Sequence, residues 1–504
     1  MEPVAAFCDP VQDGAVMQHG GRRPQLLGMA ALLVVAVIAV VSAASEFGGS
    51  PNATGGPSRT DAAVAKASSE AIAGPSGSAP STGSGQPAAT GSSAIVPGEV
   101  NRTSIKLEAT YEADVDLGFN DRSLVVDVKI SVTNRSGAGI DRVELNTITG
   151  PLGNLRLKVV RVDGVEANAN VDDQTIKVRL GGVLPDNATA LVRVRIRASI
   201  PSTLGGSNWM FTRVGGILQA NRWIPWVGLH RPFNRPNHGD PFFTALSPHV
   251  TVRITTDRKL KIATPGHRVD VDGLTQTFEA ENVRDFPIVA SPNFEVRERT
   301  VGGRTLRAYR LPGFPTANVI DWMADGLEEM SELAGDYPYQ RFTVAQTAGG
   351  YALEGPGMIW IPTGLSGTNL RWNVYHETAH QWFYGIVGSD HARDPFADET
   401  VATHLGQVVS GIWRNTGCPM KRLDLSIYNY SEACYFGQVY LHGADLLRRV
   451  RRDMAAGEYW EGVRAYVAEY HFRIGSTKKF LDALQAATNR NLTPILAPWF
   501  PSLF

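Results

Sequence analysis

The pentapeptide HETAH, residues 376–380, constrains this chain more than any other feature, because it places two imidazoles and a carboxylate within five residues. On a helix, residues four apart share a face, so His376 and His380 can bind one cation while Glu377 lies beside them as a general base. Glu399 follows nineteen residues after His380, far enough for a turn and a second helix to return its carboxylate as a third ligand. Three protein ligands leave one position for water or substrate, which is typical of catalytic zinc. The motif therefore predicts a catalytic site with one zinc ion per chain.

Apolar residues on both sides of the motif indicate that its helix is buried. Tyr375 precedes the motif and the tetrapeptide QWFY, residues 381–384, follows it. Buried ionisable groups need partners, and a metal ion is one such partner. The segment 388–395, GSDHARDP, predicts a loop, and a helical pattern that carries Glu399 resumes from 396.

Metal-bound histidines usually donate their second nitrogen to a carboxylate or carbonyl group. Three residues near the motif are candidates for this outer contact, and the sequence does not rank them: Asp398, Thr403 and Asp390. His404 lies five positions after Glu399, off the face that carries the ligand, so we expect a structural role for it.

Residues 104–300 alternate apolar and polar side chains with period two, and Gly, Asn and Asp mark the breaks. This pattern predicts antiparallel strands, about a dozen by usual strand and turn lengths. The segment 221–228, NRWIPWVG, either lines a substrate groove or fills a core, and aromatic residues more often do the latter.

From Thr316 the apolar period becomes helical, and most of the chain from Gln438 to Leu496 follows the same pattern. Four arginines within residues 448–452 are expected on a solvated helix face. The fold class is therefore α+β and multidomain. We predict an antiparallel β-sandwich-like domain at 101–302 and a mainly α catalytic domain at 303–504.

The N-terminal region predicts export. Residues 26–44 are apolar and uncharged after Arg22 and Arg23, just long enough to span a bilayer. We expect a cytoplasmic leader at 1–24, a membrane anchor or a cleaved signal at 25–45, and a disordered linker at 46–100 that is rich in Ser, Gly, Ala and Pro. In both cases the catalytic part lies outside the cytoplasm, anchored to the cell membrane by the N-terminal helix or secreted after cleavage.

Cysteine content limits the possible disulfides, and the net charge argues against a nucleic-acid partner. Cys418 and Cys434 either pair after export or remain buried thiols, while Cys8 precedes the apolar segment. The formal net charge is −1, from 48 basic and 49 acidic residues, so we expect no nucleic-acid partner.

Taken together, these motifs resemble the aminopeptidase N-like zinc metallopeptidases, gluzincins with HExxH and a downstream glutamate, and in particular their exported bacterial members. The matching features are HQWFYG at 380–385, the GxD loop, the R-x-P step at 393–395 and the DE pair before the second helix. The resemblance implies a thermolysin-like catalytic domain whose zinc ligands are His376, His380 and Glu399.

The same resemblance implies further site residues. The segment 350–359 matches the family motif whose glutamate binds the substrate's α-amino group, which makes Glu354 that anchor, with Gly350 and Ala352 beside it. The hexapeptide VYLHGA at 439–444 matches a helix whose tyrosine stabilises the transition state, which makes Tyr440 catalytic together with Glu377. Tyr435 either assists Tyr440 or is a packed aromatic residue.

Several positions depart from the family pattern. They lie beside the matched residues and affect pocket shape more than ligands: Leu353, Gly355, Thr400 and His442. The chain ends soon after Phe500, whereas many relatives add a large helical domain, so the size limit of the substrate stays open.

We therefore expect a zinc-dependent aminopeptidase that hydrolyses the N-terminal bond of peptides or proteins. A metalloendopeptidase would keep the zinc chemistry without needing Glu354. A silent, membrane-tethered binding or sensor module is a third hypothesis, although such a module would not need Glu377.

Overall fold

Alternating apolar residues build three sheets in the N-terminal half of the protein. The computed structural model describes residues 94–233, 239–414 and 418–504. The strands of these three sheets are β1 (Leu107–Gly118), β2 (Ser123–Asn134), β3 (Ile140–Asn146), β4 (Arg156–Val162), β5 (Val165–Glu166), β6 (Ala169–Asp172), β7 (Thr175–Leu184), β8 (Thr189–Ser199), β9 (Phe211–Val214), β10 (Ile217–Ala220), β11 (Trp226–Val227), β12 (Ser247–Thr256), β13 (Lys261–Ala263), β14 (His267–Asp272), β15 (Thr275–Val283) and β16 (Ile288–Ser291).

The largest sheet has eight strands in the order β14-β15-β12-β1-β2-β8-β4-β5, and two four-stranded sheets follow the orders β11-β3-β7-β6 and β13-β16-β10-β9. Within the described part of the chain, β1 and β12 form the one parallel pair of these sheets, with Tyr111 opposite Val250. The strands exceed the predicted dozen because β5, β11 and β13 have only two or three residues each.

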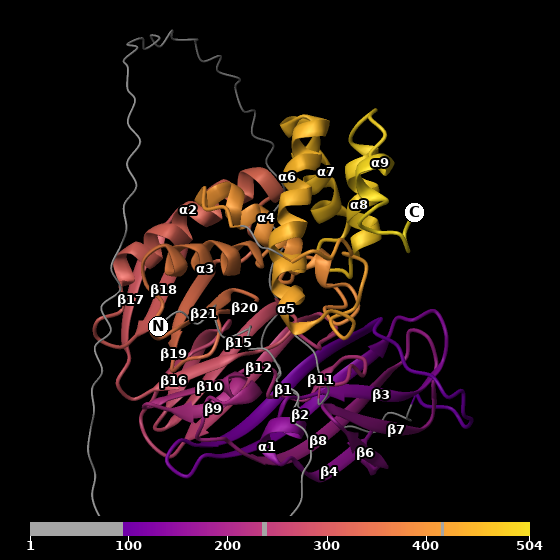
Figure 1. Cartoon of the computed structure of the whole chain (residues 1–504). Helices are drawn as coiled ribbons and strands as arrows, with labels where there is room; N and C mark the ends of the chain where they lie inside the picture. The colour runs from indigo at the N-terminus through magenta and orange to yellow at the C-terminus, as the bar shows by residue number, and fades with distance from the viewer. Residues whose placement is uncertain (1–93, 234–238, 415–417) are drawn as a thin grey trace, which may run out of the picture. The chain divides into compact units, whose positions relative to one another are not determined.

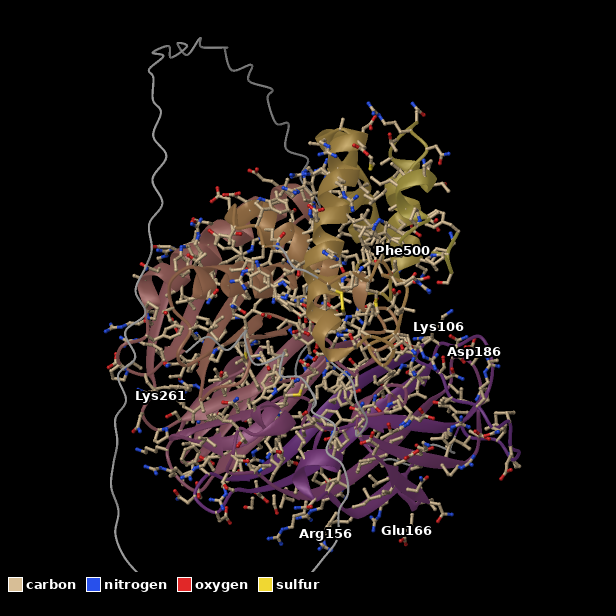
Figure 2. All side chains as sticks on the ribbon, viewed as in Figure 1. Lys106, Arg156, Glu166, Asp186, Lys261 and Phe500 are labelled. Carbon is tan, nitrogen blue, oxygen red and sulfur yellow. A yellow bond between two sulfur atoms is a disulfide. The ribbon has the colours of Figure 1, made fainter. Side chains whose placement is uncertain are left out.

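One face of the eight-stranded sheet packs into the core and the other carries charged residues. On β1, every second residue from Leu107 to Leu117 is buried. Figure 2 shows Arg156 and Glu166, both exposed, pointing away from the sheet. The tryptophan-rich segment belongs to the core, since Trp226 stacks on Tyr111 with ring centroids 4.1 Å apart.

A five-stranded sheet opens the catalytic half. Its strands are β17 (Glu295–Val301), β18 (Arg304–Arg310), β19 (Arg341–Thr347), β20 (Leu353–Gly355) and β21 (Met358–Pro362), in the order β17-β18-β19-β21-β20. The β17–β18 hairpin crosses the predicted domain boundary at 302/303. Helices α2 (Thr316–Ala334) and α3 (Gly367–Ala379) pack on this sheet (Figure 1).

The remaining helices are α1 (Thr149–Gly153), α4 (Glu399–Ser410), α5 (Glu432–Tyr435), α6 (Gly443–Met454), α7 (Ala456–Glu469), α8 (Thr477–Ala486) and α9 (Thr493–Leu496). Two 3₁₀ segments, Gly206–Met210 and Pro395–Ala397, and a π-helix, Phe436–His442, complete the list. The α+β class, with a β-rich N-terminal part and a helical C-terminal part, is thus confirmed. Cys418 and Cys434 form a disulfide.

The structure describes only the last residues of the predicted N-terminal region. The predicted leader, membrane segment and most of the linker lie outside the described residues. The last linker residues are an exception, because the backbone of Val96 exchanges two hydrogen bonds with Val183. Among the helices in the described part of the chain, none combines the length and the apolar character needed to cross a bilayer.

Candidate metal centre and its surroundings

His376 and His380 lie on one face at the end of α3. The helix ends at Ala379, and His380 is its C-cap residue with helical φ and ψ of −62° and −12°. The four-residue spacing therefore keeps its helical geometry, and the two Nε2 atoms lie 3.2 Å apart.

Glu399 is the first residue of α4, which packs against α3. Its Oε2 atom lies 3.3 Å from Nε2 of His376 and 3.2 Å from Nε2 of His380. The predicted helix from 396 is 3₁₀ over Pro395–Ala397 and becomes α-helical only at Glu399. Two elements separated by a loop thus bring the three predicted ligands together.

These three atoms match the geometry of a zinc site. In a tetrahedral site with bonds of 2.0–2.1 Å to nitrogen and oxygen, neighbouring ligand atoms lie about 3.3 Å apart. The three observed separations of 3.2, 3.3 and 3.2 Å agree with that value. The side chains are also shielded from solvent, with exposed fractions of 6%, 1% and 9% for His376, His380 and Glu399. One triangular face of a zinc coordination sphere is therefore already in place.

The structure distinguishes the three candidates for outer contacts. Nδ1 of His380 lies 3.0 Å from both the Phe383 carbonyl and Oδ1 of Asp398. Nδ1 of His376 lies 3.3 Å from the hydroxyl of Thr403. Asp390 does not reach either ligand, because it pairs with Arg231 of the β-rich region.

Glu377 and Glu354 lie beside the metal ligands. Atoms of Glu354, Glu377 and His380 that could bind a cation lie within 4.8 Å of one another. Burial raises the pKa of Glu377, His380 lowers it and Glu399 raises it again, with a result of about 8.

Glu354 is positioned by β20, the edge strand of the five-stranded sheet. Its side chain is buried, and burial raises the pKa of Glu354 well above its ordinary value. Within the described residues no hydrogen bond or ion pair reaches its carboxylate, so a cation placed beside it would favour the charged form that burial disfavours.

Gly350 and Ala352 precede this strand. Gly350 is exposed and has φ of +97°, and a Cβ atom there would lie 2.6 Å from the Trp209 side chain. Ala352 is half-buried. Gln219 contacts the loop that carries Gly350, because its amide donates hydrogen bonds to the carbonyls of Trp209 and Gly349.

Tyr440 approaches the centre from the π-helix Phe436–His442. Its ring centroid lies 5.5 Å from that of His376, and burial followed by the Glu399 carboxylate raises the pKa of Tyr440 well above its ordinary value. Thr400 of α4 donates a hydrogen bond to the Val439 carbonyl in this segment. Single π-helical turns are often found at functional sites, and this one carries Tyr440.

Two further residues, Tyr435 and His404, are buried near the metal centre. Tyr435 is buried, with its ring centroid 5.9 Å from that of Tyr440, and a Cβ atom on Gly239 would meet its hydroxyl at 2.1 Å. Nδ1 of His404 lies 3.1 Å from the Ala444 carbonyl, away from the three ligands.

Sequence reasoning missed two residues at the site. His391 and Asp240 place cation-binding atoms within 4.8 Å of each other and of Glu354. The histidine carries a weak signal, as an imidazole eight residues before the third ligand in a loop with two aspartates. Asp240 comes from the β-rich region, and nothing in its surrounding sequence marks it.

Buried arginines of the β-rich region contact the loop that follows α3. Arg284 donates hydrogen bonds to the carbonyls of Tyr384 and Arg473 at 3.0 and 2.8 Å. Arg222 donates to the hydroxyl of Tyr384 at 3.3 Å. The β-rich region therefore supports the catalytic half at the metal centre itself.

No protein-family model matches the chain. The glutamyl aminopeptidase of Rattus norvegicus is 24% identical over 148 residues, which cover 25% of this chain and 16% of that protein. The match thus spans less than a fifth of the curated relative.

Solved structures match much more of the chain. An M1 zinc metallopeptidase from Deinococcus radiodurans is 20% identical with a TM-score of 0.60, covering 78% of this chain and 93% of that one. A mutant of the Deinococcus radiodurans enzyme with a bound Tyr-Ser-Ala substrate is 19% identical with a TM-score of 0.61, covering 81% and 96%. A two-domain M1 mutant bound to L-arginine is 19% identical with a TM-score of 0.59, covering 78% and 93%. The chain has the fold of the M1 zinc metallopeptidases, and this confirms the resemblance at the level of fold.

Proposed function

We propose that this protein is a zinc-dependent aminopeptidase that removes N-terminal residues from peptides outside the cytoplasm. The observation that carries the proposal is the position of Glu354, a buried carboxylate within 4.8 Å of both Glu377 and His380. An endopeptidase has no use for a negative charge at this place, whereas an aminopeptidase must bind a free ammonium group beside the bond that it cleaves. The likeness to M1 zinc metallopeptidases supports the same function.

His376, His380 and Glu399 would hold the zinc ion. When bound there, zinc polarises the scissile carbonyl and lowers the pKa of a water molecule toward neutrality. Asp398 and Thr403 orient the two imidazoles through their Nδ1 atoms, which directs the Nε2 atoms to a common point.

Glu377 is the general base. It takes the proton of the attacking water and then gives it to the leaving amine. Tyr440 donates a hydrogen bond to the oxyanion, a contact that strengthens only as negative charge develops. Glu354 binds the α-ammonium group and so fixes which peptide bond reaches the base.

The place of action is part of the proposal. The apolar segment 26–44 predicts export of everything that follows it. The Cys418–Cys434 disulfide supports this location, because disulfides persist mainly in oxidising compartments. The substrates would then be extracytoplasmic peptides or protein N-termini.

The deciding experiment compares an aminoacyl fluorogenic amide with its N-acetylated form, using zinc-loaded protein. We expect cleavage of the free amine and almost none of the acetylated compound, since acetylation removes the charge that Glu354 binds. Equal cleavage of both would favour a metalloendopeptidase, and cleavage of neither across a broad peptide panel would favour the silent module.

A variant pair locates this selectivity. Glu354→Gln is nearly isosteric but neutral, so it should raise KM for the free amine and reduce the preference over the acetylated form. Glu328→Gln, at an exposed position of α2, is the matched control and should leave both quantities unchanged.

A further inference from the structure

His391 lies beside the metal centre and close to the proposed amine-binding carboxylate of Glu354. Its side chain is buried, and its Nδ1 atom lies 2.7 Å from Oδ2 of Asp398. The other oxygen of the same carboxylate, Oδ1, lies 3.0 Å from Nδ1 of His380. Asp398 therefore bridges two imidazoles, one from a metal ligand and one from His391.

His391 also lies close to the substrate end of the site. One of its nitrogens, a carboxylate oxygen of Glu354 and one of Asp240 all lie within 4.8 Å of one another. Glu354 is only 7% exposed, and atoms of Glu377 and His380 also lie within 4.8 Å of its carboxylate. The imidazole ring packed beside the two carboxylates restricts where their oxygens can lie.

The β-rich region holds His391 in this orientation. The ring of Tyr384 packs edge-on against that of His391, with centroids 5.2 Å apart and planes at 89°. The Tyr384 hydroxyl donates a hydrogen bond to Asp285 at 2.7 Å. Next to His391 in sequence, Asp390 pairs with Arg231 of the β-rich region. The loop that carries His391 is thus fixed at two points.

We propose that His391 is a positioning residue that ties the amine-binding carboxylate Glu354 to the metal ligand His380, an inference that rests on the proposed aminopeptidase function. Through Asp398 it orients His380, and with Asp240 it keeps the Glu354 carboxylate in the place that the substrate ammonium reaches. Asp240 is then a second carboxylate of the amine site. Two oxygens within 4.8 Å can both accept hydrogen bonds from one ammonium group, because each such bond spans about 2.8 Å.

The test uses full-length protein and two readouts, zinc affinity by chelator competition and KM for an aminoacyl fluorogenic amide. His391→Phe keeps a flat ring but removes both nitrogens. It should lower zinc affinity about tenfold or more, as loss of an outer contact typically does, and also raise KM about tenfold. His391→Gln retains polar atoms and should restore part of both losses.

Variants of Asp398 and of Asp240 separate the two proposed roles of His391, at the metal ligand and at the amine site. Asp398→Asn should lower zinc affinity much more than it raises KM, whereas Asp240→Asn should raise KM and leave zinc affinity unchanged. His404→Gln replaces another buried imidazole of the same half and is the control for a general cost of such a change. It should leave both quantities unchanged.

Either of two results would overturn the proposal: a His391→Phe variant with unchanged zinc affinity and KM, or one in which only one of the two changes. If His391→Phe does not fold, His391→Gln decides by the same criterion. A wild-type protein that binds zinc but cleaves neither the free nor the acetylated amide would contradict the proposed function instead.

Discussion

Gly406 on α4 lies directly against the backbone of His376 on α3. A Cβ atom at this position would stand 3.1 Å from the Tyr375 carbonyl oxygen and 3.2 Å from the amide nitrogen of His376. Backbone atoms cannot swing aside as side chains do, so the absence of a Cβ allows the close approach of these helices. That approach brings Glu399, at the start of α4, to the two histidines.

Gly406→Ala should therefore disturb the metal site in spite of the better helix propensity of alanine. Propensity favours the change by about 1 kcal/mol, while overpacking costs about 1–3 kcal/mol. We expect a lower melting temperature and about tenfold weaker zinc binding, as for other changes around metal ligands. Gly457→Ala on α7 is the control, because its Cβ would meet nothing within 4 Å and should stabilise the protein. Equal stabilisation by both changes would show that the helix contact is loose.

Glu377→Gln separates metal binding from catalysis. The side chain is not one of the three atoms at 3.2–3.3 Å that form the ligand triangle, so zinc stoichiometry should stay the same. Loss of the general base should lower kcat about 10³-fold or more. Metal analysis and steady-state kinetics on the same sample check both parts, and comparable turnover would remove Glu377 as the base.

Tyr440→Phe tests the oxyanion contact. Removing one donor of this kind lowers kcat by about 10²–10³-fold, with KM and zinc content nearly unchanged. Tyr435→Phe is the comparison, since the Tyr435 hydroxyl lies against Gly239, and its effect on kcat should be much smaller. A larger loss in the Tyr435 variant would exchange the roles of the two tyrosines.

His404 makes stability depend on pH. Burial, and then Arg451, lower the pKa of His404 from 6.5 to about 3. The unfolded chain binds a proton on this residue below pH 6.5 while the folded protein does not. The contribution of neutral His404 to the free energy of unfolding is therefore fully present above pH 6.5, and it decreases as the pH falls toward 3.

This contribution changes by up to about 1.4 kcal/mol per pH unit between those limits. His404→Gln lacks the group, so its free energy of unfolding should fall less between pH 6.5 and 4.5 than that of the wild type. Urea denaturation of both metal-free proteins measures the difference and avoids the effect of zinc release in acid. Parallel pH profiles would mean that His404 is protonated in the folded state.

The Cys418–Cys434 bond connects the chain after α4 to α5, which leads directly into the π-helix of Tyr440. With a sequence separation of 16 between the two cysteines, the closed loop should contribute about 3 kcal/mol to stability. The double variant Cys418→Ala/Cys434→Ala should therefore melt at a lower temperature and lose kcat more than zinc affinity. Treatment of the wild type with a reductant should give the same result. An unchanged kcat in both experiments would show that the disulfide does not help to position Tyr440.

The amino-acid sequence alone predicted those parts of the protein in which residues near in the chain act together. The i and i+4 spacing of His376 and His380 defines a helix face, and a period of two in β1 defines a strand with one buried side. These are local regularities of the backbone, so they can be read without knowing what packs against them. Glu399 was found from its spacing after His380, whereas Glu354 and Tyr440 were found because their short motifs resemble those of a known family.

Only the tertiary structure decided which distant residues complete the site. Whether Asp398, Thr403 or Asp390 contacts the histidines depends on the angle between α3 and α4, which Gly406 permits. Asp240, Arg222 and Asp285 lie near the centre because the β-rich region packs on the loop after α3. The π-helical turn that carries Tyr440 likewise receives a hydrogen bond from Thr400 on a separate helix, α4. Such contacts join residues that are far apart in the chain, and no local pattern of spacing or polarity encodes them.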